Sequence, residues 1–552
     1  MWRGLLLLAV VCGCRSASAP EEPEALFAEV TAAARLTGLM HINGGYGESW
    51  APEIVGGGGG FIDYDSDGWL DIIVVTGGSF EGKPPLLGHP ALRLMRNLGD
   101  GMFAEVTHET MLSQLRAYSI GLTAGDYDND GDDDLYVTTL HQNLLLRYEE
   151  GLFVDRTEEA GLGQTSEWST SAMFFDADRD GHLDLYVGTY VDWSPEKDRY
   201  CGFQGEKVYC TPELYTGISG RYYHNNGDGT FTERTEAAGF LTGVDAARDK
   251  TLGVAEMDAN GDGWPDVVVA NDTERDMLFV NRQDGTFMEQ GIASGIAYDH
   301  HGKPRAGMGV DVGVVDQSGE PTIFVGNFSD EMVGVYRHTG GGLFADRAAS
   351  SRIGQPSLRT LTFGLLLLDA DLDADLDLLI ANGHVQTHIA HIVDGVTFRQ
   401  RPQLFLNDGS GQFTEAAAVG PLAEPIVARG AAYGDYDRDG DLDVLLTENN
   451  GPIRLWQNRT QSAGWLRVTL EGRESNRNAY GAQLELWSQG RQQVRRVRSG
   501  GSYLSHSDPA AVFGLAADAD SLIIRWPSGQ VDKMGTVAAN QAVHIVEDAP
   551  AQ

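Results

Sequence analysis

Residues 126–134 read Asp-Tyr-Asp-Asn-Asp-Gly-Asp-Asp-Asp, and this stretch decides the fold because its spacing recurs along the chain. Aspartates stand at its positions 1, 3, 5 and 9, and Gly131 stands at position 6. Calcium takes six to eight oxygen ligands at about 2.3–2.6 Å, and alternate aspartates on a turning backbone can point several carboxylates at one centre. Glycine permits the turn. The stretch therefore predicts a calcium-binding loop between two strands.

The same arrangement is found six times in all, so we expect about six calcium sites. The predicted ligands at positions 1, 3, 5 and 9 are Asp63, Asp65, Asp67 and Asp71; Asp126, Asp128, Asp130 and Asp134; Asp176, Asp178, Asp180 and Asp184; Asp258, Asn260, Asp262 and Asp266; Asp369, Asp371, Asp373 and Asp377; and Asp435, Asp437, Asp439 and Asp443.

Two copies are altered, and a seventh has lost most of its oxygens. Asn260 replaces an aspartate, but an amide oxygen can still bind a cation. Ala374 stands where the other copies have glycine, which is a mild steric objection. Most acidic positions are missing from residues 314–322, and we expect no ion there. Acidic turns can also be plain soluble hairpins, but six copies in one register favour metal binding.

The loops belong to a longer repeat that predicts an all-β, seven-bladed β-propeller over residues 26–460. Each loop follows a short apolar run, and downstream come a strand that usually ends in Asn and a strand that begins with Phe. After the last Asn, Asn458, no Phe-started strand follows; a matching strand stands instead at residues 27–31. An N-terminal strand that completes the last blade would close the ring. Residues 192–220 are too long for a plain connection and are read as an insertion.

A separate small β domain is expected over residues 461–552, where the repeat signature gives way to alternating strands. This region carries four arginines in an otherwise acidic chain: Arg491, Arg495, Arg496 and Arg498. They are either a solvated strand face or a surface that docks on the acidic propeller, and both alternatives stay open.

The N-terminus and the cysteines indicate export. Residues 1–14 form a signal peptide with an apolar core, ending at a lipobox-like Cys14, with a linker over residues 15–25. An ordinary secretory signal cleaved a few residues later is the alternative. In an exported chain, Cys201 and Cys210 are expected to form a local disulfide.

The formal net charge of −40 disfavours nucleic acid as a partner. No further apolar run is long enough for a transmembrane helix, so membrane contact is expected only through a lipid anchor.

The motifs resemble two known families in sequence. The acidic repeats are similar to FG-GAP or VCBS repeats, and the C-terminal part resembles the ASPIC/UnbV domain through residues 478–482, 500–503, 513–515 and 526–529. Together they resemble the cartilage acidic protein family and its bacterial relatives, from residue 26 onward. This resemblance implies calcium-stabilised, exported interaction proteins.

We therefore expect an extracellular or cell-envelope interaction and adhesion module that binds a protein or polysaccharide. No catalytic motif is found: Gly56–Gly60 lacks the lysine of a phosphate loop, and close packing near the propeller axis explains it better. His384 and its neighbouring histidines are assigned to local structure rather than to zinc or copper. The alternative function is an extracellular carbohydrate-active enzyme that holds its substrate in the propeller funnel.

Overall fold

The computed structural model describes residues 25–45, 47–80, 83, 90–241, 249–299, 301–460 and 464–548. The predicted signal peptide, its lipidation site Cys14 and nearly all of the linker over residues 15–25 lie outside these residues.

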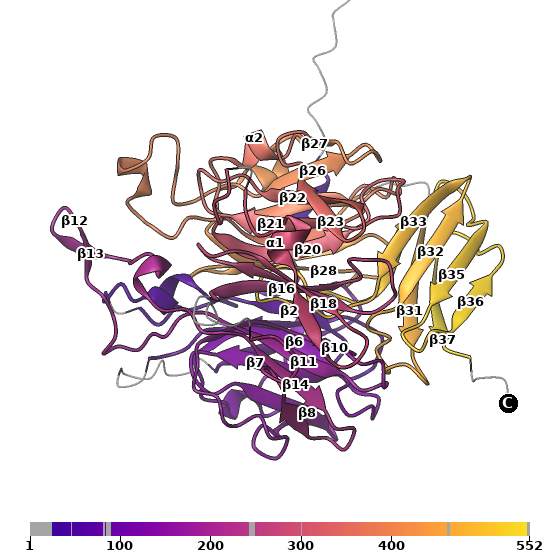
Figure 1. Ribbon diagram of the computed structural model, residues 1–552, viewed down its shortest axis with the longest axis horizontal. Helices are drawn as coiled ribbons and strands as arrows, with labels where there is room; N and C mark the ends of the chain where they lie inside the picture. Colours follow the sequence, from indigo (N-terminus) through magenta and orange to yellow (C-terminus); the bar gives the residue numbers. More distant parts are fainter. Residues whose placement is uncertain are drawn as a thin grey trace, which may run out of the picture.

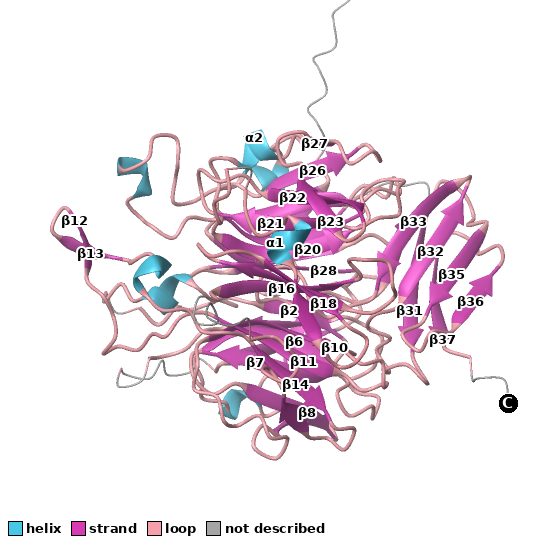
Figure 2. Ribbon diagram, in the orientation of Figure 1, coloured by secondary structure: helices cyan, strands magenta, loops and turns pink. Residues whose placement is uncertain are grey.

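The chain is all-β, and its repeats form four-stranded antiparallel sheets (Figure 2). In chain order these sheets are β2 (Gly59–Ile62), β3 (Asp71–Val75), β4 (Leu92–Asn97) and β5 (Phe103–Glu105); β6 (Ser119–Gly125), β7 (Asp134–Thr139), β8 (Leu144–Glu149) and β9 (Leu152–Asp155); β10 (Ser169–Phe175), β11 (Asp184–Thr189), β14 (Arg221–Asn225) and β15 (Phe231–Glu233); β16 (Thr251–Met257), β17 (Asp266–Asn271), β18 (Met277–Asn281) and β19 (Phe287–Glu289); β20 (Gly307–Gly313), β21 (Thr322–Asn327), β22 (Gly334–Gly340) and β23 (Leu343–Asp346); β24 (Thr362–Leu368), β25 (Asp377–Asn382), β26 (Gln403–Asn407) and β27 (Phe413–Glu415); and β28 (Ala428–Gly434), β29 (Asp443–Glu448) and β30 (Ile453–Asn458) with β1 (Phe27–Glu29).

The first two strands of each sheet are almost wholly buried, which explains their short, continuous apolar runs. Each acidic loop joins these two strands, so that position 9 opens the second strand, as Asp71 opens β3. The predicted pairing of the N-terminal strand is confirmed: Phe27 of β1 lies opposite Asn458 of β30 in antiparallel register. Phe27 also packs on Trp456, with ring centroids 6.1 Å apart.

Helices are few and short. They are α1 (Gly291–Ser294) and α2 (Gly354–Ser357), with 3₁₀ turns at η1 (Ala51–Ile54), η2 (Leu112–Gln114), η3 (Pro212–Leu214), η5 (Ile389–His391) and η6 (Gly420–Ala423). None of the helices in the described residues has the length and apolarity needed to span a bilayer.

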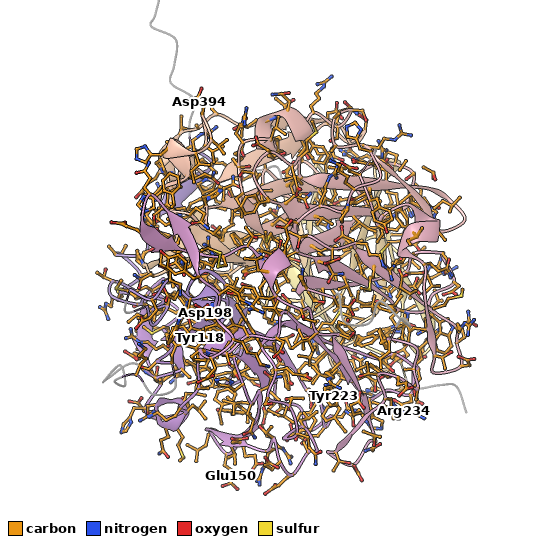
Figure 3. All side chains as sticks on the ribbon, turned by 60° about the vertical axis from the view of Figure 1, so that its left-hand side comes forward. Tyr118, Glu150, Asp198, Tyr223, Arg234 and Asp394 are labelled. Atoms are coloured by element: carbon orange, nitrogen blue, oxygen red, sulfur yellow. A yellow bond between two sulfur atoms is a disulfide. The ribbon has the colours of Figure 1, made fainter. Side chains whose placement is uncertain are left out.

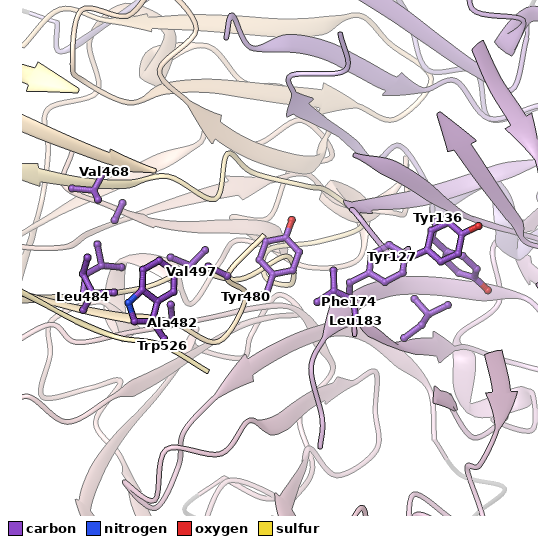
Figure 4. Packing of buried hydrophobic residues seen from close by; sticks show 14 of the residues in the cluster. Tyr127, Tyr136, Phe174, Leu183, Val468, Tyr480, Ala482, Leu484, Val497 and Trp526 are labelled. Atoms are coloured by element: carbon purple, nitrogen blue, oxygen red, sulfur yellow. The ribbon is translucent and has the colours of Figure 1, made fainter. Parts of the chain in front are cut away.

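The C-terminal region folds into two further sheets. β31 (Trp465–Glu471) lies between β34 (Ala511–Gly514) and β37 (Gln541–Val546), and the second sheet has the order β33 (Arg491–Arg496), β32 (Gln483–Ser488), β35 (Ser521–Arg525) and β36 (Val531–Met534). Side chains of both sheets share one core, which continues through Tyr480 to Phe174 and Tyr127 of the repeat sheets (Figure 4). The two regions are therefore packed together by apolar contacts.

The insertion lies on the other side of the molecule. It carries the hairpin of β12 (Cys201–Phe203) and β13 (Glu206–Val208), which stands at the left of Figure 1 while the C-terminal sheets stand at the right. The predicted disulfide is confirmed: Cys201 and Cys210 are bonded, with their Cα atoms 5.3 Å apart.

A segment of the C-terminal region, residues 498–508, runs between the repeat sheets. We call it the central segment. It contacts the first strand of five different sheets: Phe61 of β2 through the His506 carbonyl, Leu122 of β6 through the Leu504 carbonyl, Phe174 of β10 through Ser499, Val310 of β20 through the Ser502 carbonyl, and Ala431 of β28 through Ser502. A Cβ on Gly58 or Gly60 would collide with the carbonyls of Leu504 and His506. The expected close packing of Gly56–Gly60 is thus confirmed.

We predict that Gly60→Ala lowers the free energy of unfolding by about 1–3 kcal/mol, because the added methyl group meets backbone atoms of the central segment that cannot rotate away. Chemical denaturation checks this value. Gly535→Ala is the control, since a Cβ there meets nothing within 4 Å. Equal stability of the two variants would contradict the close approach of the central segment to β2.

Candidate metal centres

Backbone hydrogen bonds hold the carboxylates at positions 1 and 9 of the acidic loops. At position 1, Asp63 accepts the N–H of Gly68 at 2.9 Å. At position 9, Asp71 accepts the N–H of Tyr64 at 3.3 Å and, with its other oxygen, that of Asn97 at 2.7 Å. The contacts at position 9 recur in all six predicted loops. These aspartates therefore build the turn.

Other carboxylate oxygens of the loops are buried without a hydrogen-bond donor. At positions 1 and 3, the unpartnered Oδ1 atoms are those of Asp63, Asp65, Asp128, Asp178, Asp369, Asp371, Asp435 and Asp437. Buried polar atoms are nearly always paired, and an unpaired buried carboxylate oxygen is costly. A bound cation would satisfy these oxygens. The residues present thus fit a hard divalent ion such as Ca²⁺.

The structure brings three predicted ligands together in each of four loops. Ligand atoms within 4.8 Å of one another are found in the groups Asp63, Asp65 and Asp71; Asp126, Asp128 and Asp134; Asp176, Asp178 and Asp180; and Asp369, Asp371 and Asp377. In the loop at 435–443, Asp435 and Asp437 both have unpartnered buried oxygens.

The altered loops differ in their fit. In the loop at 258–266, the Asn260 amide donates to Asp262 at 3.0 Å, and both Asp258 oxygens accept backbone N–H groups. Hydrogen bonds within this loop already occupy these carboxylate oxygens, so the loop fits a cation less well than the others. Ala374 keeps the loop conformation with φ of 82° and donates its N–H to Asp369 at 3.1 Å, so the missing glycine does not break the turn.

In the degenerate stretch at 314–322, Asp316 forms an ion pair with Arg337, and Glu320 Oε2 lies 2.6 Å from His338 Nδ1. The absence of a metal ion there stays a prediction.

Burial and mutual repulsion raise the pKa values of the loop carboxylates in the metal-free protein. For Asp126, burial is the main cause, with neighbouring aspartates adding to it, and the pKa is about 7. Burial likewise raises the pKa values of Asp369 and Asp435 to about 7, against an ordinary value of 3.8. The folded, metal-free chain therefore binds protons that the unfolded chain releases.

We predict that calcium-free protein loses stability as the pH rises from about 4 to about 7. These carboxyl groups have a higher pKa in the folded state than in the unfolded state. Their protonation therefore stabilises the fold fully at a pH below the unfolded pKa, and this stabilisation is lost as the pH rises through the folded pKa. Thermal unfolding in EGTA across this range measures it. The stabilisation that Ca²⁺ confers should grow over the same window; a metal-free stability that rises with pH would contradict the raised pKa values.

Asparagine side chains link the loops of neighbouring sheets, a role that sequence reasoning missed although the Asn-ended strands were recognised. The Asn97 amide donates to Leu70 O of its own loop at 3.0 Å and to Tyr436 O of the last loop at 2.9 Å. The bonds to the adjacent loop are repeated by Asn225 to Tyr127 O, Asn281 to Ala177 O, Asn407 to Val315 O and Asn458 to Ala370 O. Each amide thus satisfies two buried carbonyls.

We predict that Asn225→Ala lowers the free energy of unfolding by about 1–3 kcal/mol, because it leaves the carbonyls of Tyr127 and Leu183 buried without donors. Asn226→Ala is the matched control, since the exposed Asn226 side chain bonds only within its own turn. Denaturant titration of both variants tests the difference, and a neutral Asn225→Ala would refute the linking role.

In two repeats, an arginine on the third strand of the sheet contacts the outer carboxylate oxygens of the loop, and sequence reasoning missed this too. The Arg147 guanidinium contacts Asp128 at 2.7 Å and Asp130 at 2.9 Å. Arg96 contacts Asp65 at 3.0 Å in the same way. The signal that could have found these residues is their place in the repeat. Arg96 and Arg147 each stand directly before the residue, Asn97 or Tyr148, whose N–H bonds the aspartate at position 9.

The C-terminal region covers several loops, which favours the docking alternative for its arginines. The ion pairs are Arg491 with Asp375, Arg495 with Asp369 at 3.8 Å, Arg496 with Glu256, and Arg498 with Asp311. The Asn478 side chain also accepts the N–H of Asp126 at 2.8 Å and donates to Asp133 at 2.8 Å. The loops contacted in this way lie against the C-terminal region, although Asp130 and Asp373 keep exposed side chains.

A cavity of about 560 Å³ lies on the insertion side, which Figure 3 brings forward. Its lining is mainly apolar and aromatic, and it includes the acids Asp272, Glu213 and Glu331. His384 also lines it, but its Nδ1 accepts the N–H of Gln386 at 3.0 Å and its Nε2 lies 3.3 Å from Ser329 Oγ. Both ring nitrogens are used locally, in agreement with the structural assignment of His384.

Comparisons with known proteins agree with these features. A model described as an FG-GAP-like repeat matches residues 63–137, 126–187 and 395–446, and one described as ASPIC and UnbV matches residues 472–552. Cartilage acidic protein 1 of Homo sapiens is 26% identical over 357 residues, which is 60% of this chain and 51% of that protein. The Mus musculus protein is 26% identical over 62% of this chain and 55% of its own length. The chain thus spans about half the length of the curated relatives it matches.

Two solved structures show more distant similarity. An Agrocybe aegerita lectin, studied for recognition of non-reducing terminal N-acetylglucosamine, is 14% identical with a TM-score of 0.41, over 66% of this chain and 87% of its own. BBS1N, solved in complex with ARL6DN, is 11% identical with a TM-score of 0.37, over 73% and 91% of the two chains. By these matches, the chain carries FG-GAP-like repeats and a C-terminal region that matches ASPIC and UnbV, and it is similar to cartilage acidic protein 1.

Proposed function

We propose that this protein is an exported, calcium-stabilised β-propeller that acts as an interaction module for an extracellular protein or polysaccharide. The observation that carries the calcium assignment is the set of buried Oδ1 atoms at loop positions 1 and 3 that have no hydrogen-bond donor. A divalent cation would supply the missing partner, and the oxygen-only ligands suit Ca²⁺.

The proposed ring has seven blades, one for each repeat sheet. Its support is the order of contacts among first strands: β2 packs beside β6, β6 beside β10, β10 beside β16, β16 beside β20, β20 beside β24, β24 beside β28, and β28 again beside β2. The pairing of β1 with β30 and the central segment, which reaches five of these strands, agree with a ring around an axis.

Calcium is assigned a structural role. The loops lie where the first two strands of a sheet meet, and asparagine side chains connect one loop to the next. The C-terminal sheets cover the loops at 126–134 and 369–377. The partner is therefore expected to bind on the opposite face, where the disulfide-bonded insertion and the cavity lie.

Export and attachment rest on other evidence. The disulfide and the similarity to cartilage acidic protein 1 support an extracellular location. Attachment through a lipid on Cys14 is part of the proposal and rests on the lipobox-like sequence alone.

The alternative, an extracellular carbohydrate-active enzyme, is favoured by one observation. Asp272 and Glu331 both line the cavity, and burial raises the pKa of Asp272 to about 7 and that of Glu331 above its ordinary value. Paired carboxyl groups are the usual acid and base of glycoside hydrolysis. A screen against polysaccharides with wild type and Asp272→Asn separates the two functions. Hydrolysis by the wild type that is lost in Asp272→Asn would support the enzyme and argue against the interaction module.

We predict that Ca²⁺ raises the melting temperature and that EGTA reverses the effect. At 100 times the dissociation constant, each independent site would add about 2.7 kcal/mol to the free energy of unfolding. Scanning calorimetry and equilibrium dialysis measure the shift and the number of bound ions, and Asp128→Asn should weaken one site only. An unchanged melting temperature in EGTA would contradict the proposal.

A further inference from the structure

One loop has a nitrogen atom beside its carboxylates. His224 lies on β14, directly before Asn225, in the position that faces the outer oxygens of the loop at 176–184. In the other predicted loops this position is taken by Arg96, Arg147, Val280, Leu406 and Gln457. Arginine, valine and leucine side chains offer no lone pair to a metal. The Gln457 amide donates to Asp437 at 2.7 Å. Among these six positions, His224 alone offers an imidazole nitrogen.

The distances around His224 suit a small ion. Its Nδ1 lies 3.1 Å from Asp184 Oδ1 and 3.7 Å from Asp178 Oδ2, and the three residues form one group of ligand atoms within 4.8 Å. In a tetrahedral zinc site with bonds of about 2.0–2.1 Å, neighbouring ligand atoms stand about 3.3–3.4 Å apart. The two measured separations bracket that value. Asp178 also has a buried Oδ1 without a donor.

Asp184 does not depend on the histidine for its hydrogen bonds. It accepts the backbone N–H of Asn225 at 2.7 Å and that of Ala177 at 3.1 Å, and the Tyr222 hydroxyl at 3.1 Å. Both of its oxygens are therefore partnered before His224 is counted. The hydrogen bond between His224 Nδ1 and Asp184 Oδ1 can therefore be replaced by a metal ion bound between these two atoms without leaving Asp184 unpartnered.

We propose that the loop at 176–184 together with His224 binds a first-row transition metal of the Zn²⁺ class in preference to Ca²⁺. Imidazole is a good ligand for zinc, whereas calcium takes oxygen ligands. This inference rests on the proposed function, because it assumes that the loops hold divalent cations. The chain would then carry two kinds of metal centre, with calcium in the oxygen-only loops and a transition metal in this one.

The test uses the full chain in saturating Ca²⁺, to which Zn²⁺ is added. Calorimetry and metal analysis after dialysis give the stoichiometry, and NMR of ¹⁵N-labelled histidine rings reports coordination directly. We expect one Zn²⁺ per chain that excess Ca²⁺ does not displace, with a shift of the His224 ring nitrogen.

His224→Leu should lower the Zn²⁺ affinity by more than about tenfold and leave Ca²⁺ binding at the other loops unchanged. His182→Leu is the matched control, since His182 lies in the same loop but its ring contacts Asn129 rather than the carboxylates. Zn²⁺ binding that persists in His224→Leu would show that the imidazole only braces Asp184, and it would overturn the inference. Calcium binding by wild type without any Zn²⁺ uptake would overturn it as well and leave the proposed function intact. Failure to bind either ion would overturn both.

Discussion

The structure depends on carboxylates buried at the turns between the first two strands of its sheets. In these turns, some aspartate oxygens accept backbone N–H groups and others have no hydrogen-bond donor. Asp71 uses both oxygens to hold backbone N–H groups, whereas Asp63 and Asp65 each keep a buried oxygen with no donor. Because repulsion and desolvation both oppose this crowding, a cation bound at these oxygens would be energetically linked to the fold.

Neighbouring sheets are coupled at the same turns. The Asn225 amide bonds both Leu183 O and Tyr127 O and so joins two loops. The C-terminal region adds a second layer of coupling. Its arginines pair with buried acids such as Glu256 and Asp311, which would be costly to leave unpaired in the absence of that region. The repeat sheets and the C-terminal sheets therefore form one energetic unit.

The features that could be predicted from the sequence are local ones. The spacing of aspartates and glycine, the Cys201–Cys210 pair and the Phe-started strand at residues 27–31 each lie within a few residues of their signal. The pairing of β1 with β30 is one long-range contact that the repeat pattern predicted, but other contacts between distant parts of the chain could not be predicted. Asn97 reaches Tyr436, and the central segment reaches strands of five sheets. The loop at 258–266 shows a different limit: the sequence counts Asn260 for its amide oxygen, but the NH₂ group of the same amide donates a hydrogen bond to Asp262.

The central segment also connects the two faces of the molecule. It leaves the C-terminal sheets next to Arg498, which pairs with Asp311, and passes His506 beside β2. Its Tyr503 is fully buried and packs on Phe363, a residue that lines the cavity on the insertion side, with ring centroids 5.0 Å apart. The same apolar cluster contains Trp193 and Cys210 of the insertion. The central segment therefore packs against residues that line the cavity, and the disulfide-bonded insertion forms part of its border. The cavity lining is therefore held in place by packing outside the cavity, which is the support that a preorganised binding site needs.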